Sequence, residues 1–339
     1  MRVRTTTVIA LLVGSLSTAT PARAADLADF FAGKQVRFIV PSGPGGGYDL
    51  YMRALAQYMG PHIPGRPTAV VLNMPGGGGV KATNYVYNVA AKDGTVLGMP
   101  FFNLPLFELV RPVGIKFNMS KMHWVGNMAE LNSSIVVMSS SPIRTIEDAR
   151  KQEVILGSSG KGSESYIYPQ LCNALLGTKF KMVLGYDSTA VMTVAMERGE
   201  IAGRGGSWLM WPESRPDWVR DGKIRVLVQA GRTRDPDLKD VPLITELAAE
   251  KDKPVARFIS SAVTTARMVG LPPGVSDEVV QAMRRAFDDT MKDPVFVADA
   301  KKRQLDIRSM TGEQVQAEIE QLFRTPKSVI AQAKQALAY

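Results

Sequence analysis

The fold is decided by residues 36–59, which read VRFIVPSGPGGGYDLYMRALAQYM. The stretch begins with a short β-favouring run, residues 36–41, that stops at proline and glycine as a strand does. A glycine-rich turn at 43–47 follows, and apolar residues then recur at helical spacing as far as Met59. A strand, a glycine turn and a helix in this order predict the first unit of a sheet that helices cover on both faces.

The same alternation continues along the chain and predicts an α/β protein. A strand is predicted at 69–72, a helix at 81–91 and a third strand at 95–99. Ligands of such sheets gather at the carboxyl ends of the strands, beside the helix N-termini. Further strands are predicted at 133–138, 154–156, 181–184, 201–202 and 224–230, and helices at 145–151, 166–176, 191–198, 277–291, 294–303 and 313–325.

The N-terminal residues have the pattern of an export signal. Arg2 and Arg4 precede a short apolar run at 8–16, and Ala22-Arg23-Ala24 supplies the small residues that a signal peptidase reads. The run is shorter than the roughly 20 apolar residues that span a bilayer. We therefore predict that residues 1–24 are a signal peptide and that the protein is periplasmic. Loss of the three leader arginines lowers the net charge from +9 to +6.

Composition argues against several classes of function. The basic residues are scattered, whereas nucleic-acid binders concentrate them on one face, so no nucleic-acid partner is expected. Cys172 is the only cysteine, so no intramolecular disulfide forms. With His62 and His123 as the only histidines, neither a His/Cys metal cluster nor a triad beside a nucleophile motif is expected. No cofactor is predicted.

Three glycine-rich turns stand at strand ends just before helices, at 42–49, 75–79 and 157–163. Without side chains, their backbone N–H groups can face a ligand, and the following helix adds its positive end. Three such turns, one of them far along the chain from the other two, predict an anion held between two lobes.

Enzyme motifs fail in detail at these turns. A Walker loop requires Lys-Ser/Thr after its last glycine, where the chain has Tyr48 and Asp49. A dinucleotide fingerprint from Gly43 requires glycine at position 48, and a nucleophile elbow at Ser159 requires glycine at Lys161. No catalytic residue is predicted.

At these loops the chain resembles the solute receptors of tripartite tricarboxylate transporters, the Bug family. Its motifs appear in order between about residues 35 and 325. They read VPSGPGGGYD at 40–49, NMPGGGG at 73–79, DGT at 93–95, GKGS at 160–163, DVP at 240–242 with Glu246, and PPG at 272–274 with DP at 293–294.

The resemblance implies a two-lobed, Venus-flytrap, type II-like periplasmic binding protein in which each lobe is a mostly parallel sheet flanked by helices. We predict lobe 1 at 25–127 plus 232–339 and lobe 2 at 128–231, with the cleft between them. It also implies that backbone amides, partly through water, hold a carboxylate. By position, the implicated residues are Ser42, Gly45, Gly46, Gly47, Tyr48, Asp49, Gly76, Gly77, Gly78, Gly79, Ser158, Ser159, Lys161, Gly162 and Ser163.

Other residues join the predicted ligand-binding set. Arg204 stands where the family commonly has an apolar strand end; it either binds a carboxylate bidentately or lies on the surface. Phe101, Phe102 and Asn103 either line the pocket or belong to the core. Asp187 completes the set. For Asp49, stabilising the helix start and orienting water or a ligand amine stay equal alternatives.

The sequence thus predicts a monomeric periplasmic receptor that closes by a hinge motion on a small dicarboxylate, tricarboxylate or aromatic acid. Its implied partner is a membrane permease with one large and one small subunit. The alternatives are a sensory receptor of the same fold that feeds a signalling kinase and, with less support, a periplasmic hydrolase.

Overall fold

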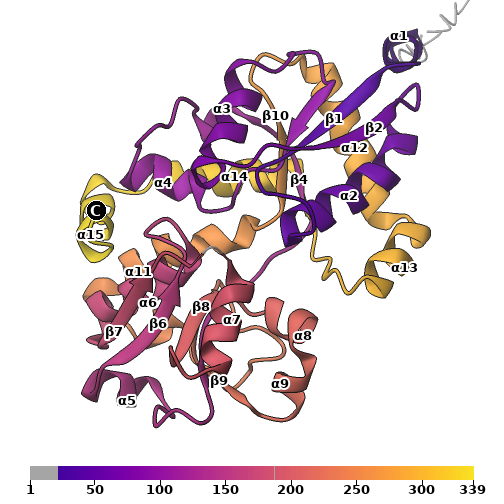
Figure 1. The fold of residues 1–339 in the computed structure, drawn as a ribbon. Helices are drawn as coiled ribbons and strands as arrows, with labels where there is room; N and C mark the ends of the chain where they lie inside the picture. Colours follow the sequence, from indigo (N-terminus) through magenta and orange to yellow (C-terminus); the bar gives the residue numbers. More distant parts are fainter. Residues whose placement is uncertain (1–21, 187) are drawn as a thin grey trace, which may run out of the picture.

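The computed structural model describes residues 22–186 and 188–339, which form two lobes, each built on one β-sheet (Figure 1). Residues 1–21, which hold most of the predicted leader, and Asp187 lie outside the described residues. The first sheet has the order β11-β4-β10-β3-β1-β2 and the second β7-β6-β8-β5-β9. The strands are β1 (Gln35–Val40), β2 (Thr68–Asn73), β3 (Val96–Gly98), β4 (His123–Asn127), β5 (Ser133–Met138), β6 (Val154–Ser158), β7 (Phe180–Leu184), β8 (Gly203–Ser207), β9 (Ile224–Ala230), β10 (Met268–Leu271) and β11 (Met310–Thr311).

Helices cover both faces of each sheet, as Figure 1 shows. Among residues 22–186 and 188–339 no helix has the length and apolar character that crossing a bilayer requires. The α-helices are α1 (Ala22–Phe31), α2 (Gly47–Met59), α3 (Val80–Asn88), α4 (Leu104–Val110), α5 (Ile146–Lys151), α6 (Glu164–Leu176), α7 (Thr189–Glu197), α8 (Met210–Ser214), α9 (Pro216–Arg220), α10 (Ile244–Leu247), α11 (Lys253–Ser260), α12 (Asp277–Lys292), α13 (Pro294–Lys302), α14 (Gly312–Phe323) and α15 (Lys327–Ala336). The 3₁₀ turns are η1 (Gly60–His62), η2 (Gly77–Gly79), η3 (Met119–Lys121), η4 (Glu250–Asp252) and η5 (Ser261–Thr265).

The second half of strand β1, residues 38–40, is apolar because both of its faces are buried there. Phe38 and Val40 enter the core that contains α2 and α12, whereas Ile39, pointing the other way, enters the core with α3 and α14. Phe38, Ile39 and Val40 are all at most 1% exposed.

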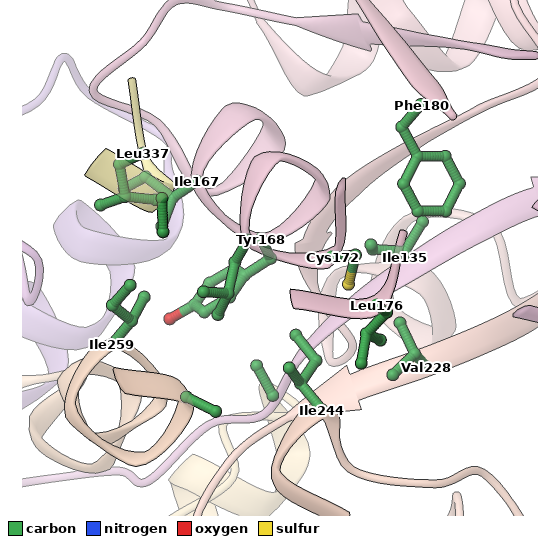
Figure 2. Packing of buried hydrophobic residues seen from close by; sticks show 14 of the residues in the cluster. Ile135, Ile167, Tyr168, Cys172, Leu176, Phe180, Val228, Ile244, Ile259 and Leu337 are labelled. Carbon is green, nitrogen blue, oxygen red and sulfur yellow. The ribbon is translucent and has the colours of Figure 1, made fainter. Parts of the chain in front are cut away.

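The second sheet has its main core on the face that α6 covers. Figure 2 shows side chains from β5, α6, α11 and the end of the chain meeting there, among them Ile135, Tyr168, Ile259 and Leu337. Cys172 is fully buried in this core, and burial raises the pKa of its thiol well above the ordinary range. It therefore acts as a small apolar residue.

The two-lobed fold is confirmed, and most strands of each sheet run in one direction, although both sheets are mixed. Strand β10 runs antiparallel to β3 and β4, and β5 runs antiparallel to β8 and β9. Each of these reversed strands follows a crossing from the other lobe. A strand that enters from the interlobe edge starts where the parallel strands end, so it must run in the opposite direction.

The two crossings lie side by side and bond to each other. The Asn127 side chain accepts a hydrogen bond from the Arg267 amide at 2.8 Å and donates to the Thr264 carbonyl at 3.3 Å. The Leu131 amide donates to the Val263 carbonyl at 3.3 Å. This paired segment is where a hinge between the lobes would lie.

The chain after β9 does not pack only on the first sheet. Residues of α10 and α11 and the end of α15 enter the core on the second sheet. The strand expected at 201–202 is instead β8, Gly203–Ser207, whose glycines gave no β signal. Thr145 caps α5, with a reciprocal capping box to Asp148.

Candidate functional site

A cavity of about 560 Å³ lies at the carboxyl ends of the parallel strands, between the lobes. All three glycine-rich turns contribute to it. This is the place where ligands bind in sheets of this kind. Its lining residues are Tyr48, Gly77, Gly78, Val80, Phe101, Phe102, Asn103, Phe107, Arg111, Val113, Ile115, Ser159, Gly160, Gly162, Ser163 and Glu164.

The first turn is held in shape by Asp49. Its buried carboxylate accepts hydrogen bonds from the Gly45 amide, Arg53 Nε and Asn73 Nδ2, at 2.9, 2.9 and 2.8 Å. Burial raises the pKa of Asp49, but these bonds act in the opposite direction and lower it to about 2. Asp49 does not line the cavity, so the geometry favours the structural alternative for this residue.

The lowered pKa of Asp49 predicts a pH-dependent contribution to stability. A carboxyl whose pKa falls from 3.8 to about 2 on folding stabilises the protein above the unfolded value. We expect Asp49→Asn to lower the free energy of unfolding by about 2 kcal/mol near neutral pH. The difference from wild type should shrink as the pH falls from 3.8 towards 2.

Urea denaturation of both proteins across this range measures the effect. A difference that stays constant with pH would contradict the assignment. Because Asp148 also has a lowered pKa but is partly exposed in the first turn of α5, Asp148→Asn serves as the comparison for a carboxylate nearer the surface.

The second turn depends on left-handed backbone. Gly76, Gly77, Gly78 and Gly79 all have positive φ, between 58° and 140°. A Cβ at Gly79 would lie 2.7 Å from the ring of Phe101, so that ring packs directly on the glycine backbone. The close approach positions Phe101 against the cavity.

An aromatic contact joins the first turn to the segment after β3. The Tyr48 and Phe101 rings lie edge to face, with centroids 4.6 Å apart. The Phe102 amide donates to the Tyr48 hydroxyl at 3.1 Å. Burial raises the pKa of Tyr48 to about 12, so the phenol stays neutral.

The third turn is organised by serine hydroxyls. Ser163 Oγ donates to the Gly160 carbonyl at 2.7 Å and lies 2.7 Å from Ser165 Oγ. The Ser159 amide donates to Ser165 Oγ at 3.2 Å. Asn103, from the first lobe, donates to the Gly162 carbonyl at 2.7 Å. The third turn is therefore in direct contact with the opposite lobe.

The expected site residues divide into two groups. Those that line the cavity are Tyr48, Gly77, Gly78, Phe101, Phe102, Asn103, Ser159, Gly162 and Ser163. Those placed behind the lining or beside it are Ser42, Gly45, Gly46, Gly47, Asp49, Gly76, Gly79, Ser158, Lys161 and Arg204. Gly47 lines a smaller interlobe cavity of about 210 Å³.

Arg204 is buried, at 1% exposure, and does not line the larger cavity. Its guanidinium lies 4.2 Å from the Trp211 ring centroid and runs over Gly206, where a Cβ would meet Nη1 at 2.8 Å. Among the described residues, Nε and Nη1 have no hydrogen-bond partner. Burial lowers the pKa of Arg204 to about 10.

Sequence reasoning missed the outer wall and the acid inside the cavity. The missed wall residues are Phe107, Arg111, Val113 and Ile115, in α4 and the loop after it. Glu164 was also missed, although it is the first residue of α6 and directly follows the GKGS motif. Its position directly after this motif could have indicated a site residue. The loop after α4 has no motif that would have indicated one.

Glu164 lies in the field of two buried guanidiniums. Burial raises the pKa of its carboxyl, while nearby Ser133, Arg267 and Arg204 act in the opposite direction. Arg267 also stacks on Tyr48, 4.2 Å from the ring centroid. Within the described part of the chain, no group of three or more potential metal ligands is found.

Comparison with known proteins places this geometry in context. The sequence profile of the tripartite tricarboxylate transporter family receptor (TctC) matches residues 52–334. Protein BugT of Bordetella pertussis is 23% identical over 301 residues, covering 86% of this chain and 85% of BugT.

Solved structures share the fold. A TctC solute binding protein from Polaromonas superposes with a TM-score of 0.67 at 19% identity, covering 88% of this chain and 98% of that one. R. palustris Rpa4515 with adipate gives 0.67 at 19% identity, over 90% and 97% of the two chains. MatC from Rhodopseudomonas palustris with bound malate gives 0.64 at 20% identity, over 88% and 99%.

Proposed function

The chain belongs to the tripartite tricarboxylate transporter family of receptors, and we propose that it captures an organic carboxylate in the periplasm for a membrane permease. The observation that carries the proposal is the meeting of three glycine-rich turns at one interlobe cavity. The leader pattern at 1–24 supports export, and the family supports a permease partner with a large and a small subunit.

Two helix N-termini point the site towards anions. Helices α2 and α6 both begin at glycine-rich turns, and neither N-cap residue, Gly46 or Ser163, makes a side-chain capping bond. Their first N–H groups therefore remain available to a carboxylate or to water that bridges to one. The adipate and malate held by two structural relatives are carboxylates, which supports the same class here.

Binding is favoured over hydrolysis by the position of the histidines. His62 bonds to Asp293 at 3.2 Å, and His123 begins β4; neither lines the cavity. Ser159 therefore has no histidine beside it that would accept its proton. We propose that the protein is a receptor and not an enzyme.

The two lobes are proposed to meet at the paired crossings, with 128–231 in the second lobe. Because α10, α11 and the end of α15 pack on the second sheet, we propose that these segments move with the second lobe. Closure around the ligand would then bring the third turn towards the first two. Small-angle scattering should show compaction when ligand saturates the protein; unchanged dimensions would argue against a hinge.

Thermal unfolding of the mature protein against a panel of organic acids tests the function. A ligand at about 100 times its Kd stabilises the folded state by about 2.7 kcal/mol. We expect at least one acid to raise the midpoint and its neutral amide to leave it unchanged. If no acid does so, and mass spectrometry of the denatured protein detects no co-purified acid, the proposed function is wrong.

A further inference from the structure

The wall of the cavity is mostly apolar. Four aromatic and three aliphatic side chains contribute to it, whereas the lining residues in the described chain include only two charged ones, Arg111 and Glu164. The apolar members are Tyr48, Phe101, Phe102, Phe107, Val80, Val113 and Ile115.

The volume of the cavity exceeds what a four-carbon acid requires. At about 560 Å³ it lies within the roughly 300–1,000 Å³ of sites that bury most of a drug-sized ligand. A small polar acid bound at the glycine turns would leave much of the aromatic wall against water. A ligand with an apolar body would remove that surface from water, which is favourable in proportion to the area.

The charges of the site accommodate one carboxylate better than two. Glu164 lies beside the third turn, and the two guanidiniums that act on it, Arg204 and Arg267, are buried behind the lining. A second ligand carboxylate near Glu164 would be repelled by it and would compete with it for those cations. Arg111 is the only cationic residue in the described lining. It is exposed at the rim, where its guanidinium carbon lies 5.3 Å from the centroid of the Tyr339 ring.

From the apolar wall, the volume and the inner acid, and resting on the proposed function, we propose that the ligand is a bulky monocarboxylate with an apolar, aromatic body. Its carboxylate meets the glycine turns and the helix N-termini. Its ring packs between Phe101 and Phe107 on one side and Val113 and Ile115 on the other.

Calorimetric titration with matched acids tests this substrate class. The probes are benzoate, 3-phenylpropionate and cinnamate, against succinate, malate and adipate, with 3-phenylpropanamide as the neutral control. We expect the best aromatic acid to bind at least about tenfold more tightly than the best aliphatic dicarboxylate, and the amide at least about tenfold more weakly than its acid.

The outcomes separate the substrate class from the function. If one dicarboxylate binds as tightly as the best aromatic acid, the proposed monocarboxylate class is wrong. The proposal that the protein is a carboxylate receptor is then unaffected. Absence of binding by all six acids overturns the class, and the panel with mass spectrometry described above then decides on the function.

One variant with a matched control tests the reason for the preference. Val113 lines the cavity and Val89 does not, yet they are 73% and 71% exposed, so neither change should affect folding. Val113→Asn should weaken aromatic-acid binding by about fivefold and leave the dicarboxylates within about twofold, whereas Val89→Asn should change neither. Equal losses for both acid classes in Val113→Asn would contradict an apolar contact.

Glu164→Gln tests the charge argument. Removing the inner negative charge should improve dicarboxylate binding more than aromatic-acid binding, so that the ratio of the two affinities falls by at least about threefold. An unchanged ratio would mean that Glu164 does not discriminate between one carboxylate and two.

Discussion

A Ser159→Trp variant should lose at least about 100-fold in affinity for the acid that binds wild type most tightly, a change of about 2.8 kcal/mol. Ser159 lines the interlobe cavity and its side chain is exposed, so an indole at this position extends into the space between the lobes. The hydrogen bond that Ser159 gives to the turn comes from its backbone amide, which the substitution keeps. Loss of binding should therefore occur without loss of folding.

Lys161→Trp is the matched control, because Lys161 is exposed in the same turn and does not line the cavity. Its carbonyl accepts a hydrogen bond from the Tyr339 hydroxyl, which a new side chain does not remove. We expect the affinity of Lys161→Trp to stay within about threefold of wild type. Calorimetric titration measures the affinity of both variants, and thermal unfolding measures their stability. Equal losses of affinity in the two variants would mean that any bulky residue in the third turn disturbs binding.

Gly203→Ala should lower the free energy of unfolding by about 3 kcal/mol or more. Gly203 lies in the middle of the second sheet, between β5 and β6. A Cβ there would stand 2.0 Å from the Val136 carbonyl oxygen and 2.8 Å from the Val137 Cα. Both are backbone atoms of a buried strand, so the conflict cannot be relieved by a side-chain rotation.

Gly43→Ala provides the comparison, since no atom lies within 4 Å of a Cβ at Gly43 and its φ is not in the left-handed region. We expect its stability to differ from wild type by less than about 1 kcal/mol. Urea denaturation monitored by tryptophan fluorescence measures both. Stability of Gly203→Ala close to that of Gly43→Ala would show that β5 and β8 can separate without cost.

The expectations from the sequence held where local chemistry alone decides the conformation. Residues 38–40 are apolar because β1 is buried on both faces there, and the glycines at 76–79 have positive φ that other residues rarely adopt. Such requirements act within a few residues and can therefore be predicted from the sequence. The first two turns could be placed together because strand ends of a parallel sheet share an edge, whereas the third turn follows a strand of the other sheet.

Tertiary structure decided the rest. The direction of β5 and β10 follows from the crossings between the lobes, and the strand Gly203–Ser207 exists because its neighbours on both sides bond to it. Likewise, Val113 and Glu164 face the same cavity although 51 positions separate them in the chain. The sequence alone determined which local segments form turns, strands and helix starts. Only tertiary packing determined which side chains form the wall, because it joins residues that no local pattern connects.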